Sequence, residues 1–313
     1  MTTATSTAAR APALRGLWDH WFFRRLRRSP AALCAAIVIL LLVFGAAAAP
    51  WIAKTNPHDL ASLDLLDSHL PPAFMAEGNP KYLLGTDSQG ADVASLILHG
   101  LRASLTVGVL AVCLSVGLGT LAGLACGYFR GRVDGIVMRI ADIQFTFPAM
   151  LLALLIGGIS QSLLSNQLRA ALAMPIVVVA LGIAHWPHFA RLVRGAVLVE
   201  SQKDYVAAAR LVGRGPAFIM FTELLPNVLN PIFVLATLDI AFAIMSEATL
   251  SFLGFGMPPT QPSLGTLIKV GYQYLFSGEW WVVVFPGLTL VLLLVAINVF
   301  GDWLRDLLDP KLR

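Results

Sequence analysis

Long apolar runs without a charged side chain dominate the sequence. Five of these runs contain no charged residue, and a sixth apolar run, Val228–Leu253, is interrupted only by Asp239 and Glu247. A helix needs about 20 mostly apolar residues to cross the core of a bilayer, whereas membrane barrel strands alternate over about 10 residues. The pattern therefore predicts an all-α integral membrane protein with six transmembrane helices. The five uninterrupted runs are Ala31–Ala53, Ala103–Phe129, Ile143–Leu168, Ala170–Ala190 and Trp280–Gly301.

The composition agrees with a membrane protein and excludes several other classes. Of the 313 residues, 57% are hydrophobic and only 13% are charged, whereas a soluble domain carries about 25% charged residues. An ordinary cytosolic enzyme, a disordered chain and a disulfide scaffold are therefore excluded. Cys34, Cys113 and Cys126 all fall inside apolar runs, so we expect no disulfide. The net charge of +4 is too small to indicate a nucleic-acid partner.

Lysine and arginine are distributed unevenly between alternate loops. Seventeen lie in the two terminal tails and in the loops after the second and fourth spans, and only five lie in the other loops. Because positive loops stay inside, both termini are expected in the cytoplasm of a bacterial inner-membrane protein. The first span follows about 30 residues, so we expect an uncleaved anchor rather than a signal peptide. The predicted organisation is a basic tail with an interfacial helix (1–30), the first span (31–53), an extracytoplasmic segment (54–102) and a core of five helices (103–313).

The longest loop on the inner side, residues 191–227, is too long for a simple connector. Its pattern predicts two short helices, Val199–Val212 and Ala217–Leu225, separated by Gly213–Pro216 and ended by Pro226. The alanine-rich centre of the first helix would let another protein approach the backbone closely. This loop is therefore predicted to dock a cytoplasmic partner, with a hairpin lying on the membrane surface as the alternative. On the outer side, Asp92–Leu105 is expected to form an amphipathic helix before the second span.

Motifs for catalysis and nucleotide binding are missing from the sequence. It contains no Walker A motif, no nucleophile elbow and no zincin motif, and its six histidines lack metal-ligand spacing. His185 and His188 flank a span end, where we expect interfacial positions. We therefore predict that the chain is not an enzyme and holds no cofactor or metal of its own.

Several segments, in order along the chain, resemble one transporter family. The segment from Asp204 to Gly213, followed by Leu224-Leu-Pro-Asn227, resembles the EAA loop of ATP-binding-cassette importer permeases. The dipeptide/oligopeptide/nickel branch, and its C-type permease in particular, is similar over nearly 290 residues. The family's acidic loop residue is replaced by Ala207, and its usual outer arginine by Ala91. The other matching segments are Leu84-Gly-Thr-Asp87, Gly127-Tyr-Phe129, Phe147-Pro148, Glu247–Gly254 and Gly301-Asp302.

The resemblance implies a division of labour among several chains. This chain would form half of a translocation pathway for di- and oligopeptides. A second permease in a heterodimer would supply the other half, and two cytoplasmic P-loop ATPases would bind ATP-Mg. An extracytoplasmic binding protein would deliver the substrate. The residues expected to dock an ATPase are Ser201, Lys203, Asp204, Tyr205, Ala207, Ala208, Ala209, Arg210 and Gly213.

Asp239 and Glu247 are the charged residues inside the fifth predicted span. A charge at this depth costs about 2.5–3.5 kcal/mol on insertion scales, so each side chain should face a cavity or a partner. We expect both residues in the translocation pathway, together with an apolar gate that includes Phe147 and Met245. The alternatives are a hydrogen-bonded interhelix tie for Asp239 and an interfacial position for Glu247.

Two further interactions follow from sequence spacing. Ser115, Gly119, Gly123 and Gly127 recur every four residues, which predicts close packing of the second span against another helix. Asp142, at the inner start of the third span, is expected to pair with Arg139 or Arg132.

Two alternative functions stay open at this stage. A nickel or glutathione importer would belong to the same family. A proton-coupled secondary transporter would use Asp239 and Glu247, but such transporters show paired halves, and this sequence has no internal repeat.

Overall fold

The computed structural model describes residues 25–55 and 63–308. Most of the predicted interfacial helix falls at 1–24, outside these ranges. Within them, strand pairing is limited to one antiparallel bridge between Thr86 and Asp92. The long helices are α2 (Pro30–Ile52), α3 (Val93–Phe129), α4 (Gly131–Thr146), α5 (Ala149–Leu163), α6 (Asn166–Glu200), α9 (Leu225–Leu253) and α11 (Trp281–Leu308). The shorter elements are η2 (Leu65–Asp67), α7 (Asp204–Leu211), α8 (Pro216–Phe218), the π turn η3 (Ile219–Leu224), α10 (Leu264–Tyr274) and η4 (Leu275–Ser277).

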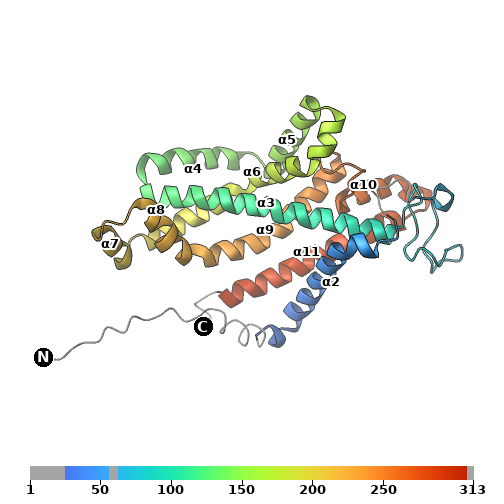
Figure 1. Cartoon of the computed structure of the whole chain (residues 1–313), viewed down its shortest axis with the longest axis horizontal. Coiled ribbons are helices and arrows are strands. Elements are labelled where there is room, and N and C mark those ends of the chain that lie inside the picture. Colours follow the sequence, from blue (N-terminus) through green and yellow to red (C-terminus); the bar gives the residue numbers. More distant parts are fainter. Residues whose placement is uncertain (1–24, 56–62, 309–313) are drawn as a thin grey trace.

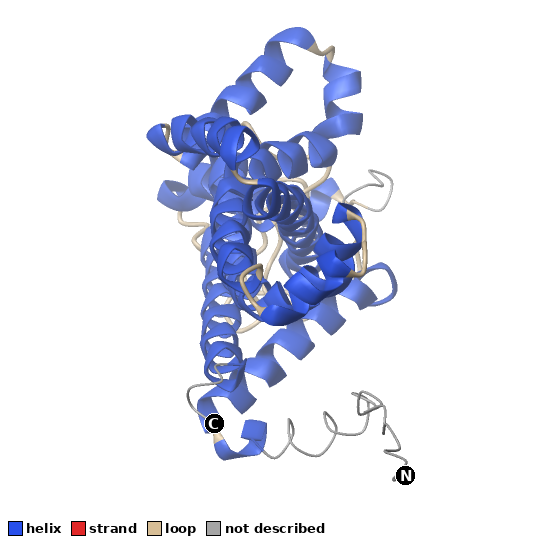
Figure 2. Cartoon of the chain, turned by 90° about the vertical axis from the view of Figure 1, so that its left-hand side faces the viewer, coloured by secondary structure: helices blue, strands red, loops and turns tan. Residues whose placement is uncertain are grey.

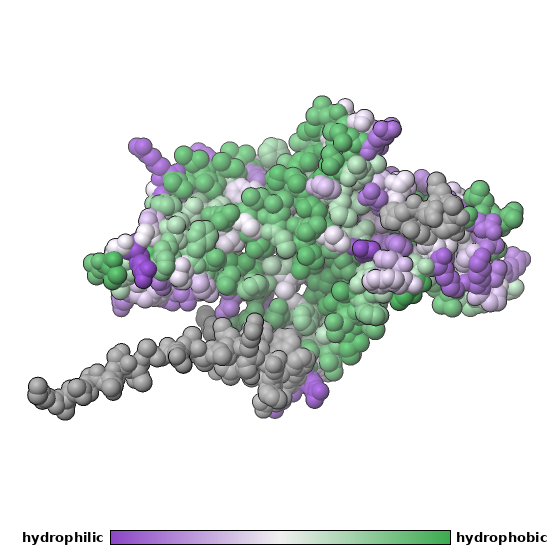
Figure 3. Space-filling view, in the orientation of Figure 1, coloured by the Kyte–Doolittle hydropathy of each residue, from purple (hydrophilic) through white to green (hydrophobic). Residues whose placement is uncertain are grey.

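α3, α4, α6 and α9 run roughly along the longest axis of the molecule, α2 and α11 run obliquely to it, and α5 turns away from it (Figure 1). α7 and α8 lie at one end, here named the α7 end, and α10 lies at the opposite end, named the α10 end, beside the segment 63–92. Figure 2 views the same helices from the α7 end. Among the described residues, five helices are long and apolar enough to cross a membrane, or up to six if the bent pair α4 and α5 forms one span. Figure 3 shows apolar side chains along the middle of the molecule, as expected for surfaces that contact lipid or another subunit.

The predicted third span, Ile143–Leu168, is not one straight helix. α4 and α5 meet at 88°, and the break falls at Phe147, which has an extended backbone, and Pro148, whose backbone is not helical. Proline disfavours the helical conformation of the residue before it, which explains why the helix ends there. α4 also begins earlier than predicted, and its charged residues lie along α6.

The second span is longer than its charge-free run. α3 begins at Val93, where the Asp92 side chain accepts a hydrogen bond from the Ser95 backbone at 3.0 Å and caps the helix. The amphipathic helix predicted at Asp92–Leu105 is therefore the first part of this 37-residue helix.

The predicted small-residue stripe packs α3 against α6. A Cβ at Gly119 would lie 2.6 Å from the Trp186 carbonyl oxygen, and one at Gly127 would lie 2.6 Å from Val197. Ser115 donates a hydrogen bond to the Gly182 carbonyl at 3.2 Å. Only residues without a larger side chain allow this approach, so the sequence-based prediction of close helix packing is confirmed.

Two clusters of buried apolar residues hold the helices together. One joins α3, α6, α9 and the loop around α7, and its fully buried members include Phe189, Ile219 and Leu224. The other joins α2, α3, α9, α10 and α11 around Ile244, Leu264 and Leu293. α3 and α9 contribute to both clusters, so they connect the α7 end to the α10 end.

Candidate functional site

The loop between α6 and α9 differs from the prediction in its boundaries. α6 continues to Glu200, well past the predicted span end at Ala190, and α7 covers only Asp204–Leu211 rather than Val199–Val212. Pro226 does not end the second helix. The π turn Ile219–Leu224 leads directly into α9, and the helix continues through Pro226. α8, η3 and α9 thereby form a single helical element that leads from the loop into the bundle.

A glycine ends α7 sharply. Gly213 has φ +78°, its N–H donates to the Arg210 carbonyl at 3.0 Å, and the Arg214 N–H donates to Ala209 at 3.1 Å. This pair of hydrogen bonds is the Schellman arrangement that closes a helix C-terminus. The backbone at the tip of the loop is therefore fixed by its own hydrogen bonds.

Few side chains connect α7 to the rest of the chain. Val206 is fully buried in the apolar cluster. The Tyr205 hydroxyl donates to the Glu200 carboxylate at 2.9 Å, and the Asn227 amide donates to the same hydroxyl at 3.3 Å. Burial and the bond to Glu200 raise the pKa of Tyr205 to about 12, so the phenol stays protonated and keeps donating. Arg130 donates to the Ser201 hydroxyl at 3.0 Å.

The outer face of α7 is apolar and uncovered. Ala207, Ala208 and Gly213 are exposed, and Leu211 and Val212 expose 89% and 76% of their surface. Large aliphatic side chains exposed together indicate a surface that another molecule covers. Charged groups lie beside this face. Lys203 pairs with Glu200 at 2.8 Å, and the Arg210 guanidinium group lies over the Tyr128 ring.

The structure therefore separates the nine predicted docking residues into two groups. Ser201 and Tyr205 are buried or half-buried and attach α7 to α6, α3 and α9, and Ala209 is also half-buried. The remaining six are exposed: Lys203, Asp204, Ala207, Ala208, Arg210 and Gly213. Leu211 and Val212 were missed by the sequence interpretation, although their apolar character at the end of a short, charged helix was a usable signal.

Asp239 is held by an interhelix contact. One of its carboxylate oxygens lies 2.7 Å from Nδ1 of His185 on α6, and both side chains are almost completely buried. Its other oxygen, Oδ2, is buried without a hydrogen-bond partner among the described residues. The sequence did not predict this partner for His185. Its partner lies 54 positions away in the sequence, and periodicity alone does not reveal such a pairing.

Glu247 is fully buried within the chain, and its position in the translocation pathway or at the membrane interface stays a prediction. Ser104 on α3 and Ser251 on α9 donate to its two oxygens at 2.7 Å and 2.6 Å. The Ser104 hydroxyl also accepts from the Leu264 backbone at 3.2 Å. These bonds compensate the cost of burying the carboxyl group and join α3, α9 and α10.

The two residues predicted for an apolar gate are both exposed. Phe147 lies at the bend between α4 and α5 and exposes 60% of its surface, and Met245 on α9 exposes 47%. Their side chains are thus available to line a surface, and their place in a gate stays a prediction.

Asp142 pairs with Arg191 of α6 at 2.7 Å rather than with Arg139 or Arg132. Asp134 and Arg194 form a second, bidentate ion pair between the same two helices. The correction follows from the bend at Pro148, because α4 lies along α6 and presents its acidic residues to it. These pairs fix the position of α4 near the α7 end.

The fold and this loop define a class of protein. It is a polytopic helical membrane protein with a short, uncovered helix at one end. Within the described residues, no group of three His, Cys, Asp or Glu side chains could hold a metal ion.

Comparison with known families identifies the class. Residues 119–313 match the family of binding-protein-dependent transport system inner membrane components, and residues 16–72 match the N-terminal transmembrane domain of oligopeptide transport permease C. The chain belongs to this family of inner-membrane transport components, and it is a multi-pass protein of the bacterial cytoplasmic membrane. The family consists of permease subunits rather than enzymes.

Relatives and solved structures agree with this assignment. The dipeptide transport system permease protein DppC of Escherichia coli K12 is 42% identical over 292 residues, 93% of each chain. The di/tripeptide transport system permease protein DppC of Pseudomonas aeruginosa is 39% identical over 93% of this chain and 92% of its own length. A chain from the inward-facing MetNI methionine ABC transporter has a TM-score of 0.53, 21% identity and coverage of 68% of this chain and 96% of its own. This last likeness concerns the fold alone.

Proposed function

We propose that this chain forms half of the translocation pathway of an ATP-driven importer of di- and oligopeptides. The peptide substrate follows from the relatives, whose names describe dipeptide and di/tripeptide transport. The other half of the pathway comes from a second, homologous permease in a heterodimer. An extracytoplasmic binding protein delivers the peptide, and two cytoplasmic ATPases bind ATP-Mg.

The uncovered face of α7 carries this proposal. Ala207, Ala208 and Leu211 form an exposed apolar surface on a helix that is stabilised by its own C-terminal cap. In our proposal this surface, together with Lys203, Asp204 and Arg210, occupies a groove of one ATPase. The α7 end is then cytoplasmic, in agreement with the excess of Lys and Arg in the loops predicted on that side.

Coupling in this proposal follows from the connection between α7 and the bundle. The helical element from Pro216 to Leu253 begins shortly after α7 ends, and Val206 of α7 is buried against the bundle. When ATP closes the ATPase dimer, displacement of α7 therefore also displaces α9. ATP shifts the equilibrium between the inward-open and outward-open states only to the extent that it binds one state more tightly than the other. Of the predicted pathway residues, Asp239, Glu247 and Met245 lie on α9, which would move, and Phe147 lies at the bend between α4 and α5.

The decisive experiment fills the small-residue surface. Ala208→Trp should weaken co-purification of the ATPases by about thirtyfold, the effect of losing an interface hot spot of about 2 kcal/mol. Ala171→Trp is the matched control, because Ala171 is an exposed alanine at the α10 end of α6. We expect both variants to insert and to elute as folded protein from a sizing column.

Two results would contradict the docking proposal. One is full recovery of the ATPases with Ala208→Trp. The other is an equal loss with Ala171→Trp, which would indicate general damage to the protein rather than a lost interface. Peptide uptake by the assembled wild-type importer tests the substrate class separately.

A further inference from the structure

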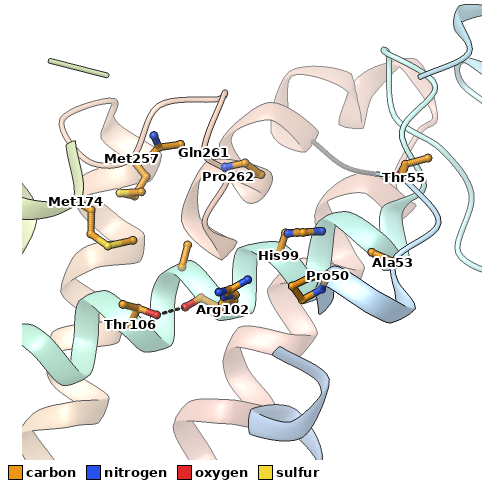
Figure 4. Close-up of a pocket in the computed structure, with 11 residues that line it drawn as sticks. Pro50, Ala53, Thr55, His99, Arg102, Thr106, Met174, Met257, Gln261 and Pro262 are labelled. Atoms are coloured by element: carbon orange, nitrogen blue, oxygen red, sulfur yellow. Dashed lines mark hydrogen bonds between the residues drawn. The ribbon is translucent and has the colours of Figure 1, made fainter. Parts of the chain in front are cut away.

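A cavity of about 520 Å³ opens at the α10 end of the molecule. Its walls come from α2, α3, α6 and the loop 254–263 that joins α9 to α10 (Figure 4). This volume lies within the range of about 300–1,000 Å³ found for small-molecule pockets. Glu247 and Asp239 are absent from its walls, so the cavity is separate from the buried carboxylates of α9.

α3 places a permanent positive charge in this cavity. Arg102 and Thr106 lie one turn apart on the same face of the helix, and both line the cavity (Figure 4). The Thr106 hydroxyl is already engaged, because it donates to the Arg102 carbonyl at 2.7 Å. An arginine side chain stays charged in proteins. Among the described residues, the cavity lining contains no Asp or Glu, and no carboxylate pairs with Arg102, whose side chain is exposed. Among the described residues, Arg102 is therefore a cavity-lining donor that is open to an anionic group.

The opposite wall is apolar and adaptable. Met174 of α6 and Met257 of the loop line it (Figure 4). The backbone of Met257 is fixed, because its N–H donates to Ser251 at 3.0 Å and its carbonyl accepts from Thr266 at 3.2 Å. Unbranched methionine side chains rearrange to fit apolar groups of different shape. Met257 is itself buried, with 3% of its surface exposed, so the adaptable apolar contact in this cavity comes from the half-buried side chain of Met174.

We propose that this cavity binds the imported peptide, with Arg102 holding its terminal carboxylate and Met174 contacting its apolar side chains. A guanidinium group binds a carboxylate through two parallel hydrogen bonds, and this contact is common to all peptides irrespective of sequence. The inference rests on the proposed function, because it takes the peptide as the transported substrate. It adds a binding site and a role for each wall of that site.

A neighbouring cavity supplies an internal control. It measures about 420 Å³, lies on the other side of the same loop, and is lined by Arg169 and Lys269. Arg169→Gln removes the same charged group from the same end of the molecule as Arg102→Gln. The two substitutions therefore distinguish the two cavities directly.

The test uses the assembled importer in nanodiscs of zwitterionic lipid, without the binding protein, and radiolabelled dialanine as the probe. We expect saturable binding to the wild type and a loss of affinity of about tenfold to a hundredfold in Arg102→Gln, as for a lost charge-assisted hydrogen bond. Arg102→Lys should lose less affinity, and Arg169→Gln should bind as the wild type does. Dialanine amide, which lacks the carboxylate, should compete at least about tenfold more weakly.

Several outcomes would overturn the site. These are wild-type affinity in Arg102→Gln, a loss confined to Arg169→Gln, equal competition by the amide, or no saturable binding to the wild type. Displacement of dialanine by phosphatidylglycerol at equal concentration would instead identify a lipid-headgroup site. Dialanine uptake and ATP hydrolysis stimulated by the binding protein are measured in parallel. If the wild type imports dialanine and Arg102→Gln imports as much per ATP, the site fails while the proposed function stands.

Discussion

The two ends of this molecule are held together in different ways. At the α7 end, a short helix is fixed mainly by one buried valine, Val206, by its own C-terminal cap and by a few side-chain bonds. At the α10 end, bonds between distant residues join several elements. The Trp281 indole donates to the Thr86 carbonyl at 3.1 Å, and the Lys54 backbone donates to Ser95 at 2.9 Å. Glu247 adds its contacts with Ser104 and Ser251.

Because of this difference, we expect substitutions at the two ends to affect different properties, the stability of the fold at one end and the binding of a partner at the other. Substitutions at the α10 end should destabilise the fold, because they leave buried groups without partners or force backbones apart. Substitutions on the outer face of α7 should leave the fold intact and change only what binds there. The predictions below test this contrast, beginning with the largest expected effect.

The strongest effect is expected where α10 meets α9. A Cβ at Gly265 would overlap the backbone of Ala248, which has no room to move in a packed helix pair. Gly265→Val should therefore cost more than about 3 kcal/mol, the upper end for overpacked cores. Thermal unfolding in detergent measures this loss.

Gly287→Val is the control for this prediction. Gly287 lies inside α11, and a Cβ there would meet nothing within 4 Å. Equal melting temperatures for Gly265→Val and Gly287→Val would show that α9 and α10 are not packed as described.

A smaller loss is expected when the carboxyl group of Glu247 loses a donor. Ser104→Ala leaves one Glu247 oxygen and the Leu264 N–H without this hydroxyl group, at a cost of about 1–3 kcal/mol. Ser162→Ala should have almost no effect, because Ser162 is exposed and bonds only to its own helix. If both variants unfold at the wild-type temperature, the serine does not stabilise the buried Glu247.

At the α7 end, Gly213 and Gly215 form a matched pair. A Cβ at either position meets nothing within 4 Å, but only Gly213 has a positive φ. Gly213→Ala should strain the cap by about 1–2 kcal/mol and reduce ATP-driven uptake by about five- to thirtyfold. Gly215→Ala should transport normally, and the two rates are compared in the same vesicles. Identical rates would show that the geometry of the cap is unimportant for coupling.

The smallest effect is expected for Tyr205→Phe. The substitution removes the hydrogen bond to Glu200 and the one from Asn227 but keeps the ring, so it should cost about 1 kcal/mol. We expect normal unfolding of the bundle and faster hydrogen exchange only in residues 201–213. Faster exchange throughout α6 and α9 would contradict the local role of this tyrosine.

Much of the fold is predictable from the sequence because it depends on local patterns. The apolar runs locate α2, α3, α6, α9 and α11, and the four-residue spacing of small residues predicts the packing of α3 on α6. The bend at Pro148 is not predictable from hydropathy. The apolar character of residues 143–168 continues through it, whereas the direction of the chain depends on the backbone of two residues.

The candidate site was predicted in part for the same reason. The docking loop follows from its alanines, its glycine and its resemblance to a known motif, all of which are local in sequence. The partners of Glu247 and Asp239 were not predicted, because Ser104 and His185 are 143 and 54 positions away. Their burial depends on how helices assemble, which the pattern of one chain segment does not contain.

The central claim is that an ATPase covers the face of α7. Its most direct test is labelling of Ala208→Cys by a water-soluble maleimide, before and after the ATPases are added. Cys34 and Cys113, which are exposed, are first replaced by serine, and Phe276→Cys at the α10 end serves as the reference because Phe276 is 88% exposed. The account predicts that the labelling rate at position 208 falls at least about tenfold, which corresponds to a free-energy difference of about 1.4 kcal/mol. The labelling rate at position 276 should be unchanged. An unchanged rate at 208 in a complex that retains both ATPases would contradict it.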